Sequence, residues 1–480
     1  MAGELTWKPA AEQANLVRSG EVTARELVEA SLDAIERLNG EINAVVTLAA
    51  ERALAEADSV QAGDARPLAG VPVLVKDLTA LTEGIRTTMG MAAMEDWTPS
   101  EDSACIRRLR GAGAIIVGKT NTPEMGILPI TEPHRFGPTR NPWNTSRTCG
   151  GSSGGSAAAI ASGMVSLAHG NDGGGSIRIP ASCCGLVGLK PSRGRISLAP
   201  QFTEVVAGFA TDGVLSRTVH DTALALDVLA GYEPGDYYWA SPPTAPFAKA
   251  PGRDPGKLRV AFTTATTNRA PVDPECERAV SEAADLLESL GHQVEEYTPP
   301  EWDDQGYVEN FIKVWMAVTE DEIHTYERLK GSPIDRDKLE PLTRQMAEIA
   351  SSISATDYLT ALDHLRRMIR RIVPFWNEYD VLVTPTLAKP PIEIGALEPA
   401  EGEPPVQMLT NSAGWVTYTP TFNVSGQPAV SLPIHVSEDG LPVGVQFVGP
   451  PEGEELLLSL SAQLEQAAPW ADRRPELALA

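Results

Sequence analysis

Two clusters of glycine and serine are the residues whose types and spacing could perform chemistry in this sequence. The first cluster is "GGSSGGS" (150–156), which contains Ser152, and the second is "GGGS" (173–176), which ends in Ser176. A helix and a strand are expected between the clusters, so chain reversal could bring the two serines together. Glycine lets backbone N–H groups turn inward towards a substrate oxygen, and such a turn can form an oxyanion hole. The alternative is that such clusters are ordinary surface loops.

A serine hydroxyl is a weak nucleophile unless a base accepts its proton. The seven histidines lack the context of a catalytic base: GxSxG does not occur as a strand-turn-helix elbow, and no HExxH motif is present. We expect His169 to be a packed, hydrogen-bonded residue. Lys76 is the other candidate base, because it ends an apolar strand. Its pKa must fall from about 10.4 to near neutrality, which burial can achieve. The alternative is a structural lysine whose ammonium group reaches solvent.

Asp172 and Arg178 are oppositely charged residues that bracket the second cluster. An ion pair between them would brace the glycine turn. From charge alone, two solvated and independent side chains are the simpler interpretation.

The elements that must position these residues follow an α/β rhythm. Thr23 and Glu26 form a capping box that begins an amphipathic helix, which is expected to end at 39–40. A buried strand is predicted over 69–78, and the glycine turn follows another at its carboxyl end, where open α/β sheets bind ligands. The remaining expectations in this half are a helix at 103–110, a strand at 114–117, a helix at 156–163 and a strand at 164–170.

The second half of the chain repeats the same pattern after a Pro- and Gly-rich connection at 232–256. Strands are predicted at 257–264, 292–297, 380–386, 429–436 and 442–449, and helices at 275–290, 307–328, 341–379 and 454–466. Because both sides of the connection carry elements of the same kind, we expect one continuous α/β layer system.

Composition argues against several classes of function. The formal net charge is −25, from 39 basic and 64 acidic residues, which disfavours nucleic acid and anionic membranes as partners. The five cysteines have no CxxC spacing, so we expect them to be reduced and the protein to be cytoplasmic. We also expect no signal peptide, anchor or membrane-spanning segment.

Residues 150–181 resemble the signature of the amidase-signature family, including the paired glycines, Asp172, Ser176, Arg178 and Pro180. The resemblance extends to "VPVLVKD" around Lys76, and to 118–126, 185–197 and 422–434. It implies a single-domain α/β/α fold over 1–480, with a large mixed sheet covered by helices. An N-terminal helical segment would occupy about 1–65, the signature core about 66–230, and the part with the substrate-pocket helices about 257–480.

The resemblance also implies roles for particular residues. Ser176 would be the nucleophile, Ser152 the bridging serine after a cis peptide bond, and Lys76 the base that forms an acyl-enzyme through this relay. Neither a metal nor an organic cofactor would be needed. The remaining assignments are oxyanion donors at Gly173, Gly174 and Gly175, loop support from Ser153, Asp172 and Arg178, and pocket walls at Met125 and Ile127.

Within the family the chain resembles hydrolases of cyclic amide dimers, but Ile127 stands where that subgroup carries asparagine, which implies an apolar pocket wall. The family also cleaves linear and aryl amides and carbamates (urethanes), so a small-molecule amide or carbamate is the expected partner. A monomer and a homodimer are both compatible with the sequence. The segments 301–320 and 408–421 are expected to shape the pocket.

Three rival functions are weaker. The amidase subunit of a tRNA-dependent amidotransferase typically carries "SSLDQIGP", whereas residues 203–221 here contain no Asp-Gln pair. A nucleotide-binding module would need GK[ST] after its glycines, or GxGxxG between strand and helix, and neither occurs in context. A relative that only binds amides is disfavoured because all three relay residues are present.

Overall fold

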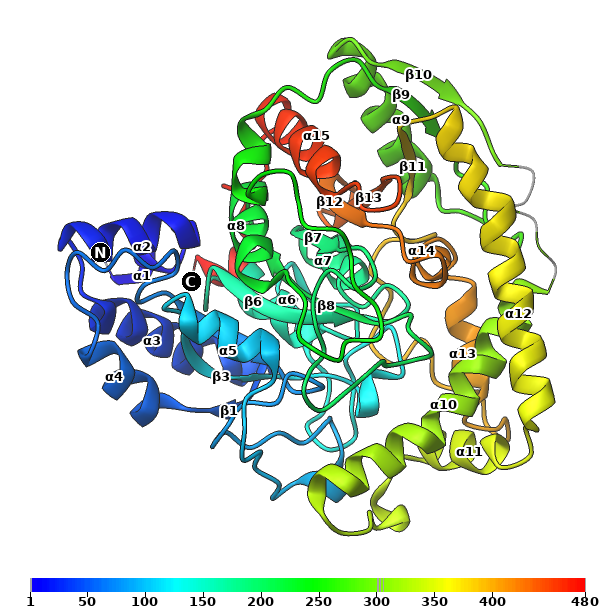
Figure 1. Ribbon diagram of the computed structural model, residues 1–480, viewed down its shortest axis with the longest axis horizontal. Helices are drawn as coiled ribbons and strands as arrows, with labels where there is room; N and C mark the ends of the chain where they lie inside the picture. The colour runs from blue at the N-terminus through cyan, green and yellow to red at the C-terminus, as the bar shows by residue number, and fades with distance from the viewer. Residues whose placement is uncertain (1, 300–301, 303, 305, 480) are drawn as a thin grey trace.

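The computed structural model describes residues 2–299, 302, 304 and 306–479, and a mixed β-sheet forms its centre (Figure 1). In that part of the chain the sheet has 11 strands in the order β1-β3-β2-β6-β8-β7-β12-β13-β11-β9-β10. These strands are β1 (Val45–Leu48), β2 (Pro72–Lys76), β3 (Ile115–Thr120), β6 (Leu167–Asp172), β7 (Val187–Lys190), β8 (Thr211–Ser216), β9 (Arg259–Phe262), β10 (Gln293–Glu296), β11 (Val381–Pro385), β12 (Ala429–Val436) and β13 (Pro442–Val448). A separate hairpin pairs β4 (Arg140–Asn141) with β5 (Asn144–Thr148).

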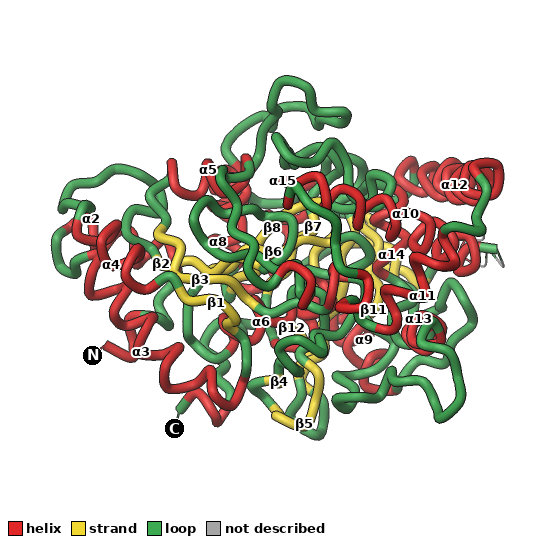
Figure 2. Tube along the Cα trace, turned by 90° about the horizontal axis from the view of Figure 1, so that it is seen from below, coloured by secondary structure: helices red, strands yellow, loops and turns green. Residues whose placement is uncertain are grey.

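Helices surround this sheet, as the view from below shows (Figure 2). They are α1 (Ala2–Leu5), α2 (Ala10–Ser19), α3 (Ala24–Ile42), α4 (Ala50–Asp58), α5 (Ala104–Gly111), α6 (Gly154–Ala161), α7 (Arg178–Cys184), α8 (Val219–Leu229), α9 (Pro274–Ser289), α10 (Tyr307–Lys330), α11 (Pro341–Ala350), α12 (Ala355–Ile372), α13 (Gln407–Ala413), α14 (Thr419–Ser425) and α15 (Glu454–Ala467). Short 3₁₀ turns lie at Ala92–Met94, Glu124–Gly126, Phe247–Gly252, Arg336–Lys338, Val373–Asn377 and Glu476–Ala478. Helices α2–α4 and α10–α12 lie at opposite ends of the molecule in both views.

The sheet separates two apolar cores. Along β2, Leu74 joins the core that contains α3, α6 and α7, whereas Val73 and Val75 join the core that contains α5, α8 and α15. This alternation follows from the opposite directions of successive side chains in a strand. Strands from both sides of the 232–256 connection belong to the same sheet, so the expected continuous α/β layer system and the mixed-sheet fold are confirmed.

Most predicted elements are present, with one clear error. Helix α3 begins at the predicted capping box, in which Thr23 and Glu26 each bond the other's backbone N–H. The single helical stretch predicted at 341–379 is wrong, because Ser354 and Asp357 form a second capping box that starts α12. Among the elements that were not predicted are β1, β7, β8, α7, α8, α13 and α14. Part of the predicted pocket segment, at 301, 303 and 305, lies outside the described residues.

The strand order explains how the site is assembled. Strands β2 and β6 are parallel neighbours, so their carboxyl ends meet at one edge of the sheet. Lys76 is the last residue of β2, while Asn171 and Asp172 end β6. The fold therefore brings the candidate base to the turn that carries Ser176.

In the described chain, no helix has the length and apolar character needed to cross a membrane.

Candidate active site

Lys76 is completely buried and lies within reach of a serine. Its Nζ donates to Ser152 Oγ at 2.7 Å and to Asn171 Oδ1 at 2.5 Å. Burial lowers the pKa of Lys76 to about 7, although Asp172 and Asp212 act in the opposite direction. The alternative of a solvent-reaching structural lysine is therefore wrong, and a neutral amine is available near physiological pH.

Asp77, the next residue after Lys76, has its own hydrogen-bond partners. Its carboxylate accepts from the Thr88 N–H at 2.9 Å and from the Thr88 hydroxyl at 2.5 Å. Its adjacency in sequence therefore does not make it the ion-pair partner of Lys76.

The first glycine cluster places two serines with different partners. The peptide bond between Gly151 and Ser152 is cis. Ser152 receives the hydrogen bond from Lys76, whereas the Ser153 hydroxyl donates to the Asn171 carbonyl oxygen at 3.1 Å. The backbone N–H of Ser153 also donates to the Ser176 carbonyl oxygen at 3.2 Å. Ser153 thus links the two clusters, which agrees with the expected support of the loop.

Ser176 lies in the pocket wall that also contains Ser152. Only 7% of the Ser176 surface is exposed, and its side chain borders cavities on two sides. Among the described residues, no hydrogen bond joins the two serine hydroxyls. Catalytic hydrogen bonds often tighten only when substrate is bound, so this gap is compatible with a relay.

The three glycines before Ser176 are not equivalent. Gly173 and Gly174 line the cavities, but the Gly175 N–H donates to Asp172 Oδ1 at 2.7 Å. A side chain at residue 175 would place its Cβ 2.2 Å from Thr419 Oγ1, and φ at this residue is +131°, so glycine is required there. The expectation that Gly175 is an oxyanion donor conflicts with this geometry, because its hydrogen already points at a carboxylate.

Asp172 and Arg178 form a fully buried ion pair. Arg178 Nη2 lies 2.9 Å from Asp172 Oδ1, and Nε donates to Oδ2 at 2.9 Å. Burial alone would raise the pKa of Asp172, but Arg178 holds that pKa well below its usual range. Arg178 also donates to Gln446 and to the Thr419 carbonyl oxygen. The alternative of two solvated side chains is wrong, and the pair braces the turn that carries Ser176.

We expect Asp172→Asn to lower the free energy of unfolding by about 3–5 kcal/mol, because it leaves the buried Arg178 charge without its partner. Urea denaturation measures this change. The matched control is Asp363→Asn, which breaks the exposed ion pair between Arg367 and Asp363. This substitution should lower the free energy of unfolding by no more than about 0.5 kcal/mol. Equal effects of the two substitutions would contradict the bracing role.

Asn171 was not assigned a role from the sequence. Its amide group accepts from Lys76 and donates to Thr79 Oγ1 at 2.9 Å, so it fixes the position of the lysine. Strand alternation gives no signal for this contact, because it groups Asn171 with Leu167 on one face of the sheet and Lys76 with Leu74 on the other.

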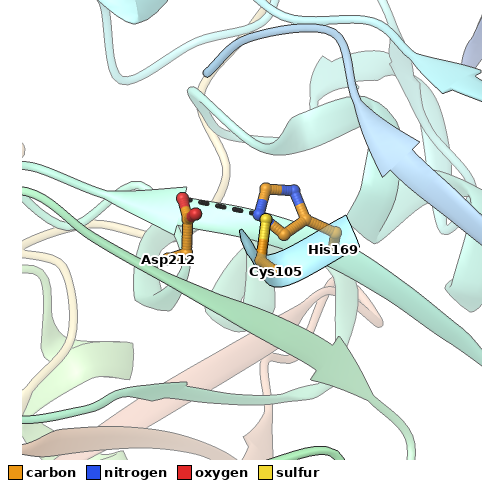
Figure 3. A group of neighbouring side chains, drawn as sticks. All are labelled: Cys105, His169 and Asp212. Carbon is orange, nitrogen blue, oxygen red and sulfur yellow. Dashed lines mark ion pairs between the residues drawn. The ribbon is translucent and has the colours of Figure 1, made fainter. Parts of the chain in front are cut away.

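Cys105, His169 and Asp212 form a buried cluster, in which Cys105 belongs to the core that contains α5 and α8 (Figure 3). His169 Nε2 lies 3.4 Å from Asp212 Oδ1, and the three possible ligand atoms lie within 4.8 Å of one another. His169 is buried as expected, but neither of its ring nitrogens has a hydrogen-bond partner among the described residues. This is the group of described side chains that could hold a metal ion, and the chemistry derived below does not use it.

Two cavities meet at Ser176. The first, which we call the acyl cavity after the substrate half that we propose for it below, has about 720 Å³ of empty space and largely apolar walls. Its walls include Ile127, Leu128, Pro129, Ile179, Val308, Ile312, Leu409, Val416 and three aromatic residues of α10, Tyr307, Phe311 and Trp315. The second, which we call the amine cavity, has about 570 Å³ and contains Ser152, Asn171 and Met125. Met125 lines the second cavity, Ile127 lines both, and residues of both expected pocket segments line the first; their contact with a substrate stays a prediction.

With this geometry in place, comparison with known proteins defines the class. The chain belongs to the Amidase family, whose model matches residues 26–458. It is 41% identical over 481 residues to a 6-aminohexanoate-cyclic-dimer hydrolase of Paenarthrobacter ureafaciens, with 98% of this chain and 97% of the relative covered. The expected kinship with hydrolases of cyclic amide dimers is thereby confirmed.

Solved structures agree with this assignment. The structure of 6-aminohexanoate cyclic dimer hydrolase complexed with substrate matches with a TM-score of 0.92 and 40% identity, covering 98% of this chain and 99% of that one. A bacterial aryl acylamidase of the amidase-signature family matches with a TM-score of 0.88 and 29% identity, with 98% of each chain covered. The protein is thus an amidase, and its activity is hydrolysis of an amide C–N bond.

Proposed function

We propose that Lys76, Ser152 and Ser176 form a proton relay that cleaves small-molecule amides through an acyl-enzyme. The observation that carries the proposal is the buried Lys76 amine, 2.7 Å from Ser152 Oγ and with its pKa lowered to about 7. A neutral amine in this position can accept a proton from Ser152, which in turn can accept one from Ser176.

In the proposed first step, Ser176 Oγ attacks the substrate carbonyl carbon while its proton passes to Ser152, and the Ser152 proton passes to Lys76. The carbonyl oxygen becomes an oxyanion. We assign its stabilisation to the N–H groups of Gly173 and Gly174, which line the cavities, because the Gly175 N–H is held by Asp172.

In the second step, the C–N bond breaks and Ser152 gives its proton to the departing nitrogen, while Lys76 returns a proton to Ser152. The acyl group is then bonded to Ser176. Water attacks this ester with the same relay as base, which releases the acid and restores Ser176. Every proton transfer in this cycle uses side chains of the protein.

The substrate halves follow from the two cavities. Ser152 must reach the departing nitrogen, so the amine half belongs in the cavity that contains Ser152, and the acyl half in the apolar cavity beyond Ser176. Linear, aryl and cyclic amides and carbamates are all candidate substrates for these two cavities. A hydrolysis screen would rank these substrate classes. It would compare linear amides, lactam oligomers, anilides and carbamates, with the products measured by mass spectrometry.

Two further properties belong to the proposal. The described cysteines, Cys105, Cys149, Cys183, Cys184 and Cys276, are free and buried, which supports a cytoplasmic location. A monomer and a homodimer are both compatible with the proposal.

The relay predicts how activity depends on pH. Because the neutral form of Lys76 is the base, kcat/KM should rise as pH increases, with a midpoint at about 7. Lys190 provides the control, since burial also lowers its pKa to about 7 but its Nζ bonds the Pro191 carbonyl oxygen. Lys190→Met should keep the midpoint. A profile that is flat from acid to alkaline pH, or a midpoint that disappears in Lys190→Met, would contradict the base assignment.

A further inference from the structure

The amine cavity contains carboxyl groups that the relay does not use. Glu322 of α10 and Asp212 of β8 both line it, together with Ser152 and Ser176. Glu322 Oε1 is buried and has no hydrogen-bond partner among the described residues, whereas Asp212 Oδ1 lies 3.4 Å from His169 Nε2. Buried polar atoms are normally satisfied, so the Glu322 oxygen indicates a missing donor in this cavity.

The protein supplies no cation to neutralise these groups from the cavity wall. No arginine or lysine occurs among the described residues that line this cavity. Lys76 lies behind it, engaged with Ser152 and Asn171. His169 is fully buried and lies 3.4 Å from Asp212. The Glu322 carboxyl remains without a basic partner, and burial raises its pKa to about 8.

The rest of the cavity suits a hydrocarbon chain. Leu78, Leu198, Val205, Val206, Ala210 and Val318 form its apolar walls. A flexible alkyl segment could therefore run from the scissile nitrogen near Ser152 towards Glu322. The acyl cavity has a different character, because its described lining contains no charged side chain.

We propose that the amine half of the substrate carries a second, protonated amine at the end of an alkyl chain, and that Glu322 binds this ammonium group. The preferred substrates are then N-acyl diamines with an apolar acyl group. This inference rests on the proposed relay, because Ser152 as proton donor decides which cavity takes the amine half. Binding of the cation stabilises the ionised form of Glu322 and satisfies its unpartnered oxygen. The net charge of −25 also favours the approach of cationic substrates.

The test compares two amides of equal shape. N-benzoylputrescine ends in an ammonium group, whereas N-benzoylpentylamine ends in a methyl group at the same place. We expect kcat/KM to be about tenfold to hundredfold higher for the putrescine amide, because hydrogen bonds to charged groups contribute about 1.5–3 kcal/mol. The cadaverine and hexylamine amides repeat the comparison with a longer chain.

Glu322→Gln should reduce this preference to about threefold or less, because it keeps the shape of the side chain and removes its charge. The matched control is Asp321→Asn on the same helix, whose side chain is exposed and which should preserve the preference. A wild-type enzyme that cleaves the neutral amides equally well would overturn the inference and leave the relay intact. An undiminished preference in Glu322→Gln would overturn the assignment of the ammonium site.

Binding separates this inference from the relay itself. In Ser176→Ala, calorimetry with the uncleaved amides should show N-benzoylputrescine binding at least tenfold more tightly than N-benzoylpentylamine. If no amide were hydrolysed by the wild type, the relay would fail, and this binding ratio would still decide whether the ammonium site exists.

Discussion

Lys76→Met is expected to lower kcat/KM by about ten-thousandfold while the protein stays folded. Methionine fills nearly the same buried volume but cannot accept a proton, so Ser152 and Ser176 lose their base. Steady-state kinetics on any amide that the wild type hydrolyses measure the loss. Lys119→Met is the matched control, because Lys119 is also buried but bonds the Ala80 carbonyl oxygen, away from the serines. Near-wild-type turnover of Lys76→Met at neutral pH would show that another group is the base.

The same substitution should increase stability at low pH. The pKa of Lys76 is about 7 in the folded protein and about 10.5 when unfolded, so the unfolded chain binds more protons between these values. The wild type therefore gains stability as pH rises from 7 to 10.5. Below pH 7 the buried ammonium costs on the order of 5 kcal/mol. Lys76→Met should thus raise the denaturation midpoint most at acid pH and least near pH 10.

Ser176→Ala is expected to reduce hydrolysis to the background rate, because it removes the hydroxyl on which the relay forms the acyl bond. Losses of about a millionfold are known for the nucleophile of a serine hydrolase. Ser152→Ala should lower kcat/KM by about a thousandfold or more, since it interrupts both the proton path and protonation of the leaving nitrogen. Both variants should unfold at wild-type denaturant concentrations.

Ser153→Ala is the control for these two variants. Its hydroxyl bonds the Asn171 backbone, so its loss should cost about 1 kcal/mol of stability and change kcat far less. If Ser153→Ala were as inactive as Ser152→Ala, the two serines would have been assigned in the wrong order.

The parts of this site that sequence could predict are those set by local pattern. The apolar run before Lys76 and the glycines around Ser152 and Ser176 determine a strand end and two turns, whatever lies beyond them. The α/β rhythm favours parallel neighbours, but it does not indicate that β2 pairs with β6. Before any coordinates, only the family resemblance joined Lys76 to the two glycine clusters.

The parts that sequence could not predict depend on distant segments. Arg178 reaches Thr419 and Gln446, more than two hundred residues along the chain, and no local pattern indicates that contact. Glu322 has the charge and helical setting of an ordinary surface residue, and only the packing of α10 over the cavity reveals its position. The hydrogen bond that occupies the Gly175 N–H likewise depends on the direction of one side chain.

The measurement that tests the relay most directly is capture of the acyl-enzyme. Rapid acid quenching during turnover of a slowly hydrolysed amide, followed by intact-mass and peptide mass spectrometry, locates the acyl group. The relay predicts one acyl group per chain, on the peptide that contains Ser176, with its formation abolished in Lys76→Met. An acyl group on another residue, or undiminished acylation without the lysine, would contradict it.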